Sequence, residues 1–200
     1  DSPGGLQEIS GDVHLREMDI TDTDQVAAVA NELRDVAIDV LINNAGITGP
    51  EDDSVTFGNI DITTWQNVMR INTMAPLKVA EAFLNHVKAS EQKTIVFVSS
   101  RASSIAERGA LPHHKPGGSY IFRSNKAALN NVARSLAFDL AASGVEVLVL
   151  SPGWARTDAG GPDAEINPGT SVCGMRRVIA DPSPSASSGF QDYDGQIIPW

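Results

Sequence analysis

The sequence has little cysteine and little positive charge, and each shortage excludes a class of protein. Cys173 is the only cysteine among the 200 residues, so no disulfide can form within the chain. A lone thiol agrees with a reducing compartment, and no neighbouring residues suggest that Cys173 is a nucleophile or a metal ligand. Only 15 Lys and Arg residues oppose 25 Asp and Glu residues, and the net charge of −10 argues against a nucleic-acid partner.

Long apolar runs are also missing. No stretch approaches the ~20 apolar residues of a membrane-spanning helix, and residues 1–5 have neither the basic nor the apolar region of a signal peptide. The four histidines have no Cys or carboxylate partners at ligand spacing, so we expect no metal site. A content of 42% hydrophobic and 20% charged residues predicts one soluble, cytoplasmic globular domain over residues 1–200, without a membrane partner.

What the chain does contain is an alternation of β-rich and helical segments. This pattern predicts an α/β fold with a doubly wound parallel sheet, Rossmann-like, covered by helices on both faces. The predicted strands are 13–19, 38–42, 93–99 and 145–150, with 196–200 as a candidate last strand. The predicted helices are 22–36, 61–89 and 119–142, with a short one in 168–180 before a Pro/Ser linker at 181–188.

Five short motifs stand at the ends of the predicted strands or within the predicted helices. They are Asn43-Asn44-Ala45-Gly46, Ile71-Asn72-Thr73, Ser99-Ser100, Phe122-Arg123-Ser124-Asn125-Lys126, and residues 151–157 with their Pro-Gly pair. In order and spacing they resemble the motifs of the short-chain dehydrogenase/reductase family. The residues at 160–164 and 192–200 resemble its C-factor-like branch.

The resemblance implies an NAD(P)-dependent oxidoreductase that acts on a carbonyl or alcohol substrate. It implies that Ser100 bonds the substrate oxygen, Asn72 anchors a water and Lys126 holds the nicotinamide ribose, as members of the catalytic set. The residues that it implies for cofactor binding are Asp19, Ile20, Asn44, Ala45, Gly46, Lys126, Pro152, Gly153 and Thr157. The cofactor would be NAD or NADP, and the residues that choose between them are not recognisable.

Phe122 departs from the family pattern, because the family has its catalytic tyrosine at this position. A phenyl ring can neither give nor take a proton, so we expect impaired turnover. Tyr120 is a candidate substitute. On a helix, however, residues 120 and 126 are about 600° apart and point in different directions, whereas 122 and 126 share a face at about 400°. Tyr120 would reach the site only if the helix began after it.

The second departure is at the amino end. The family opens with a strand, a Gly-rich turn and a helix that holds the pyrophosphate, and Gly4, Gly5 and Gly11 do not have that spacing. By resemblance, the chain starts near the third strand of the family fold, which is then N-terminally incomplete. We therefore expect the edge of the 38–43 strand to be exposed and the binding of NAD or NADP to be weak or absent.

Two functional classes stay open at this point. The first is an oxidoreductase for a small carbonyl or alcohol substrate, impaired by Phe122. The second is a catalytically silent descendant that acts as a binding or signalling module; a nicotinamide sensor is a third reading. Nothing in the loops 48–59 and 155–180 identifies a substrate. The family resemblance also implies a homo-oligomer, in which the long helices at 61–89 and 119–142 pack between subunits.

Overall fold

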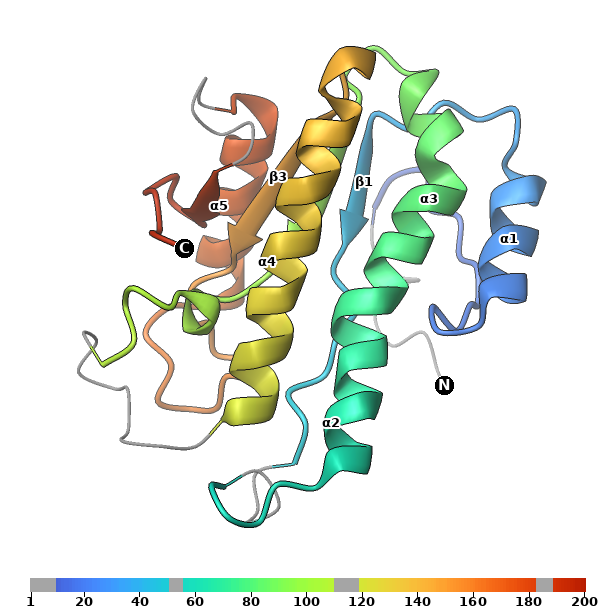
Figure 1. Cartoon of the computed structure of the whole chain (residues 1–200). Helices are drawn as coiled ribbons and strands as arrows, with labels where there is room; N and C mark the ends of the chain where they lie inside the picture. Colours follow the sequence, from blue (N-terminus) through green and yellow to red (C-terminus); the bar gives the residue numbers. More distant parts are fainter. Residues whose placement is uncertain (1–9, 51–55, 110–118, 183–188) are drawn as a thin grey trace.

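The structure, a computed structural model, describes residues 10–50, 56–109, 119–182 and 189–200. Its sheet has four parallel strands in the order β1-β2-β3-β4 (Figure 1). The strands are β1 (Val40–Asn43), β2 (Thr94–Val98), β3 (Glu146–Ser151) and β4 (Phe190–Asp192). The predicted strands at 38–42, 93–99 and 145–150 are thus confirmed, and so is the α/β fold class.

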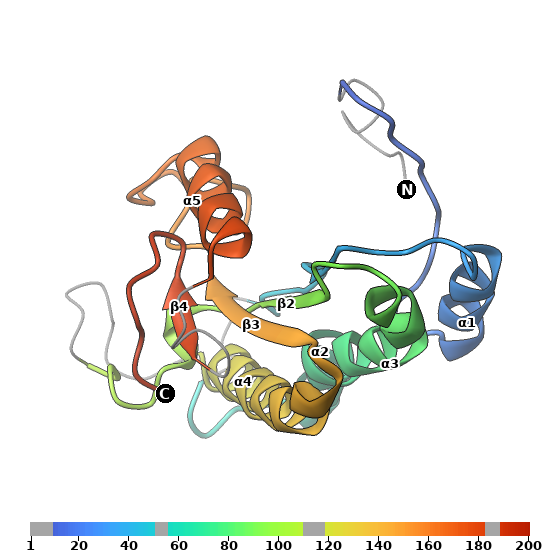
Figure 2. The same ribbon diagram turned by 90° about the horizontal axis from the view of Figure 1, so that it is seen from above.

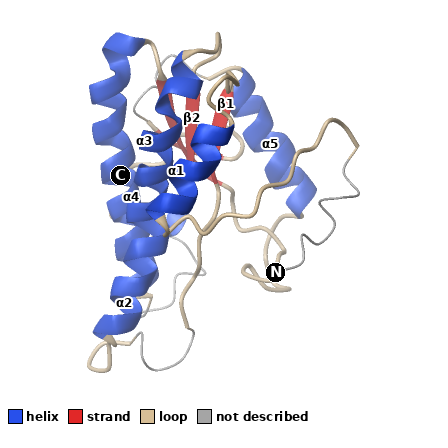
Figure 3. Ribbon diagram, turned by 90° about the vertical axis from the view of Figure 1, so that its right-hand side faces the viewer, coloured by secondary structure: helices blue, strands red, loops and turns tan. Residues whose placement is uncertain are grey.

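Helices cover both faces of this sheet, as Figure 2 shows from above. On one face lie α2 (Ile62–Met69), α3 (Ala75–Lys88) and α4 (Tyr120–Leu140), with α1 (Thr23–Glu32) outside α3. On the other face lies α5 (Pro168–Ala180), which Figure 3 shows across the sheet from α3 and α4. Short 3₁₀ turns, η4 (Arg101–Ser103) and η5 (Ala141–Ser143), follow β2 and α4.

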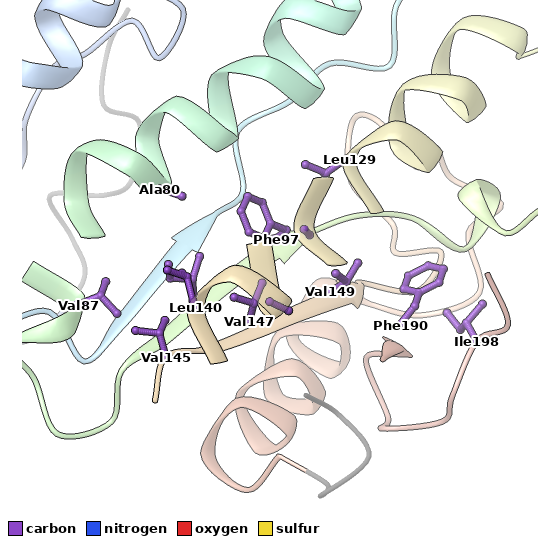
Figure 4. Close-up of a cluster of buried hydrophobic side chains, with 13 residues drawn as sticks. Ala80, Val87, Phe97, Leu129, Leu140, Val145, Val147, Val149, Phe190 and Ile198 are labelled. Carbon is purple, nitrogen blue, oxygen red and sulfur yellow. The ribbon is translucent and has the colours of Figure 1, made fainter. Parts of the chain in front are cut away.

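The alternation of side chains along β2 and β3 divides the core in two, because successive strand residues face opposite sides of a sheet. Phe97 and Val149 belong to the cluster under α3 and α4, which also holds Leu129 (Figure 4). Their neighbours Val96 and Leu148 belong to the cluster under α5. Both strands are buried over nearly their whole length, as parallel strands covered on two faces should be.

The predicted helix at 61–89 is present as one continuous rod with a wider turn in its middle. Between α2 and α3 the residues of η3 (Arg70–Met74) form a π-helical turn. Such turns occur frequently at functional sites. The helix begins at the cap Asp61, whose side chain accepts a hydrogen bond from the Thr64 N–H.

Residues 13–19 form no strand, and this prediction was wrong. A strand needs a neighbour for its backbone hydrogen bonds, and among the described residues none pairs with this segment. The segment contacts α1 instead: Arg16 forms an ion pair with Glu32, and Met18 packs in the cluster that joins α1 to α3. Within the described ranges no strand pairs with the outer edge of β1, and Ile42 is 51% exposed.

The last strand was also misplaced by the sequence pattern. Residues 196–200 turn back on β4, so that the Ile198 N–H donates to the Phe190 carbonyl over 2.8 Å. Ile198 is buried by this return, and Ile197 forms only an isolated antiparallel bridge with Gln191. Most of the predicted linker at 181–188 lies outside the described residues. None of the described helices combines the length and the apolar character that crossing a membrane requires.

Candidate active site

The carboxyl ends of β1, β2 and β3 bring three of the sequence motifs to one edge of the sheet. They surround an open cavity of about 390 Å³. Its lining includes Asn44, Thr48, Val98, Ser100, Phe122, Pro152, Gly153, Trp154, Thr157 and, from α5, Pro168, Ser171, Val172 and Met175. This is the edge at which open α/β sheets bind their ligands.

Lys126 reaches the edge of this site from α4 and is only 7% exposed. Its Nζ donates to the Val98 carbonyl over 2.9 Å. Burial away from water disfavours the ammonium form and lowers the pKa of Lys126 to about 8. Gly46 lies against this amine, since a Cβ on Gly46 would be 3.6 Å from Nζ and 3.1 Å from the Asn72 Oδ1. The absence of a side chain at Gly46 thus leaves room where Lys126 and Asn72 meet.

Asn72 lies in the π-helical turn and is completely buried. Its side chain bonds both backbone groups of one residue after β1, Ile47. Oδ1 accepts from the Ile47 N–H over 2.9 Å, and Nδ2 donates to the Ile47 carbonyl over 2.7 Å. The next residue, Thr73, donates to the Asn125 carbonyl over 2.9 Å and so ties the turn to α4. The side chain of Asn72 therefore shapes the loop that carries Asn44, Ala45 and Gly46.

Phe122 lines the cavity one helical turn before Lys126. Its ring has no proton to exchange with anything that the cavity holds. Tyr120 is the first residue of α4, so the condition for its reaching the site, a helix that begins later, is not met. Its ring lies against the exposed Phe57 at 6.3 Å between centroids, and Tyr120 is not part of the cavity lining.

Ser100 caps η4, and its Oγ accepts a hydrogen bond from the Ala102 N–H over 3.2 Å. A buried network that the sequence reasoning missed holds the adjoining backbone. Asn130 accepts from Ser99 over 2.5 Å and donates to Ser103 over 2.7 Å. Ser103 in turn donates to the Ser100 carbonyl over 2.6 Å. Asn130 lies one turn after Lys126 on the buried face of α4, which also carries Asn125, so its polar character alone did not single it out.

The loop after β3 is shaped by Gly153, which has φ +69°. A Cβ there would come within 2.7 Å of the Tyr193 ring and 2.8 Å of Ile166, so only glycine fits. Ser171 of α5 donates to the Pro152 carbonyl over 2.5 Å and fixes the loop from the other side. The sequence offered no local signal for Tyr193 or Ser171, which are far along the chain.

Asp19 and Ile20 are not part of the cavity lining. Asp19 is exposed and accepts two hydrogen bonds from Thr21, at 2.8 Å each, from the backbone N–H and the hydroxyl. These bonds stabilise the carboxylate and lower the pKa of Asp19. Ile20 packs in the cluster that joins α1 to α3. In the part of the chain that the structure describes, no three His, Cys, Asp or Glu side chains gather as a metal ion would require.

Comparison with known proteins identifies the architecture. Residues 4–166 match the profile of the family described as short chain dehydrogenase. The chain belongs to the short-chain dehydrogenase family. This confirms the resemblance read from the five motifs and explains why Asn44, Ser100 and Pro152 converge on one edge of the sheet.

Relatives of this short-chain dehydrogenase include both enzymes and a protein named for signalling. It is 39% identical to the C-signal of Myxococcus xanthus over 163 residues, which cover 82% of this chain and 93% of that protein. It is 30% identical to the 1-hydroxy-2-glutathionyl-2-methyl-3-butene dehydrogenase of a Rhodococcus strain, covering 92% of this chain and 78% of the relative. The first relative supports the C-factor-like branch.

Solved structures of related proteins have the same fold. The NADPH-bound carbonyl reductase from chicken fatty liver superposes with a TM-score of 0.81 at 30% identity, over 92% of this chain and 75% of that one. The carbonyl reductase Sniffer of D. melanogaster gives a TM-score of 0.83 at 28% identity, over 94% of this chain and 78% of that one. This short-chain dehydrogenase thus spans about three quarters of the length of these two reductases, and the Rossmann-like fold is confirmed.

Proposed function

We propose that this chain is a nicotinamide-dependent oxidoreductase for small carbonyl or alcohol substrates in which Phe122 suppresses turnover. One observation carries the proposal: Phe122 lines the same cavity as Ser100 and lies one helical turn before the buried Lys126. The cavity has the residues that orient a substrate oxygen, and it lacks a phenol at the place where the family resemblance puts one.

The described residues fit the nicotinamide half of NAD or NADP. The cavity at the sheet edge is lined by Asn44, Val98, Pro152, Gly153 and Thr157. Gly153, held in its left-handed conformation against Tyr193 and Ile166, sets the course of the loop that would lie along the ring. When bound, the nicotinamide would supply or accept a hydride. Lys126 would hold the ribose, since its Nζ has two further protons besides the one donated to Val98.

The chain's own groups would divide the remaining work. The Ser100 hydroxyl would donate to the substrate oxygen, where negative charge develops during reduction. Phe122, which lines the same cavity, would supply no proton to that oxygen. Loss of a positioned general acid costs on the order of 10²- to 10⁴-fold in rate, so the unaltered chain should be slow.

The test is Phe122→Tyr in the full chain, assayed with NADPH and NADH on a small aldehyde. The new phenol would be one turn from Lys126, whose positive charge favours the phenolate. We expect kcat/KM to rise by about 10²-fold or more. Phe138→Tyr is the matched control, because Phe138 is 65% exposed on the same helix and should leave the rate unchanged. High turnover by the unaltered chain, with no gain from Phe122→Tyr, would refute the proposal.

A second candidate function is a catalytically silent binding or signalling module. Phe122 favours it, and so does the 39% identity to a protein named C-signal. The two readings differ in one outcome. If Phe122→Tyr restores turnover, the rest of the site is still built for catalysis; if it restores none while the fold is intact, the silent module, or a nicotinamide sensor, is the better description.

A further inference from the structure

A second hollow, of about 220 Å³, adjoins the candidate site. Its lining consists of Ser100, Arg101, Ala102, Arg123, Ser151, Gly153 and Trp154. Ser100, Gly153 and Trp154 also line the larger cavity, so the two spaces meet at Ser100. A substrate whose oxygen bonds to Ser100 would have the cofactor on the Phe122 side and this second hollow on the other.

The two arginines of the hollow differ in their partners. Arg101 is neutralised, because its Nε and Nη2 each donate to Glu107 over 2.7 Å and its Nη1 donates to Asp192 over 3.1 Å. Arg123 has no carboxylate partner among the residues that the structure describes. Arg101 thus faces two carboxylates, and Arg123 is the guanidinium of the hollow that has no carboxylate of its own among the described residues.

The hydrogen bonds of Arg123 are also incomplete. Nη1 donates to the Ala102 carbonyl over 2.9 Å, and this is the one hydrogen bond that the guanidinium, with its five N–H donors, makes to the described part of the chain. Its Nε is buried and has no hydrogen-bond partner within the described ranges. Burial, with a contribution from the charge of Arg108, lowers the pKa of Arg123. A guanidinium in this state would gain both a counter-charge and acceptors from an anion.

We propose that Arg123 and the adjoining hollow bind a carboxylate of the substrate, which makes the substrate class carbonyl compounds that carry a carboxylate beyond the reacting carbon. The inference rests on the proposed function for the place of the carbonyl at Ser100. The planar fork of Arg matches a carboxylate with two parallel N–H donors, so a neutral amide of the same shape is a poorer ligand. Arg123 follows Phe122 directly in the chain, and one helix therefore positions both residues at the site.

The test compares two matched probes, 4-formylbenzoate and 4-formylbenzamide, by calorimetric titration of the full chain without cofactor. We expect the carboxylate to bind at least about tenfold more tightly than the amide, since a hydrogen bond to a charged group is stronger than one between neutral groups. Arg123→Gln should abolish this preference. Arg34→Gln is the control, because it removes the same charge from an exposed residue that is not part of the hollow.

Several outcomes overturn the inference. Equal affinity of the unaltered chain for the two probes would overturn it, and this result does not depend on whether a variant folds. A preference for the carboxylate that persists in Arg123→Gln would also overturn it. If inorganic phosphate binds as tightly as 4-formylbenzoate in a competition titration, the hollow is a general anion site and not a substrate subsite. Arg123→Lys, which keeps the charge, should retain part of the preference.

The result is separable from that of the Phe122→Tyr experiment. Binding is read without hydride transfer, so a carboxylate preference that depends on Arg123 stands even if Phe122→Tyr shows no turnover. Conversely, an active Phe122→Tyr chain that reduces the two probes equally well, with equal KM, would keep the oxidoreductase and refute the carboxylate subsite.

Discussion

Lys126 is a buried lysine at the candidate site, and burying its charge lowers the stability of the folded chain. Its amine is taken out of water and given the Val98 carbonyl as its acceptor, with no carboxylate bonded to it in the described structure. Burial lowers the pKa of Lys126 from 10.5 to about 8. In the unfolded chain the lysine keeps its ordinary pKa, so between the two values the unfolded state binds more protons than the folded one, and stability rises with pH.

This linkage predicts the effect of replacing Lys126. Below pH 8 both states are charged and the full desolvation cost is present; as pH rises through 8 toward 10.5, the folded chain loses its proton and the cost is relieved. Lys126→Met should therefore stabilise the protein most at low pH, by up to about 3 kcal/mol, and this gain should shrink above pH 8. Urea unfolding from pH 7 to pH 10 measures the difference between the two chains. Lys88→Met, at an exposed position of α3, should show no such trend.

A pH-independent difference between Lys126→Met and the unaltered chain would contradict the pKa that burial implies. It would mean that the amine reaches water in the folded state. The same comparison bears on the site, since a neutral Lys126 near pH 8 can exchange a proton close to physiological pH, whereas a permanently charged one cannot.

At the level of elements, the buried network of Asn130 connects α4 to the loop after β2. It joins Ser99, Ser103 and, through Ser103, the backbone of Ser100. We expect Asn130→Ala to lower the free energy of unfolding by about 1–3 kcal/mol, because it removes the acceptor of the buried Ser99 hydroxyl and the amide that donates to Ser103. The neighbouring Asn131 is exposed, so Asn131→Ala should change stability by no more than about 0.5 kcal/mol.

Urea unfolding of the two variants is the measurement. Equal effects at 130 and 131 would show that the network adds nothing beyond the loss of one asparagine. Asn130→Ala in the Phe122→Tyr chain adds a second readout: kcat/KM should fall while the order of preference among cofactors stays the same, since the network holds Ser100 and does not line the cavity.

The elements also show what the sequence can and cannot predict. The strands at 38–42, 93–99 and 145–150 and the helices at 61–89 and 119–142 were predictable, because apolar periodicity directly reflects which side chains are buried. The segment 13–19 has a strand-like composition and forms none, because pairing depends on a neighbour that local sequence does not report. The short β4 follows a polar, Ser-rich stretch and carries no such pattern.

The same distinction applies to the site. Motif spacing was enough to bring Asn44, Ser100, Phe122 and Pro152 to one cavity. The roles of Asn130 and Arg123 were not predictable, because each depends on contacts with η4, across a loop from α4. Asp19 has its carboxylate bonded to Thr21 and lies outside the cavity lining, so its part in cofactor binding stays a prediction.

At the level of the whole molecule, the sheet is covered unevenly. In the part of the chain that the structure describes, no strand pairs with β1 on its outer side, and Val40 and Ile42 line an open groove of about 550 Å³ beside α5. The cavity of the candidate site is lined by residues that follow β1, β2 and β3 and by residues of α4 and α5, and the groove beside β1 shares none of these residues. Self-association through the long helices stays a prediction.

This uneven cover predicts weak dinucleotide binding by these 200 residues. The nicotinamide half would meet a preformed cavity, but the sequence has no G-x-G-x-x-G turn to hold the pyrophosphate, and a net charge of −10 opposes a polyanion. Calorimetric titration with NADPH and with NADH should give a dissociation constant in the range of about 0.1 mM or weaker, less than roughly 6 kcal/mol of binding free energy. Lys126→Met should weaken the signal further if the ligand occupies the cavity. Submicromolar binding by the unaltered chain would show that the described walls suffice, and that the open β1 side has no part in holding the cofactor.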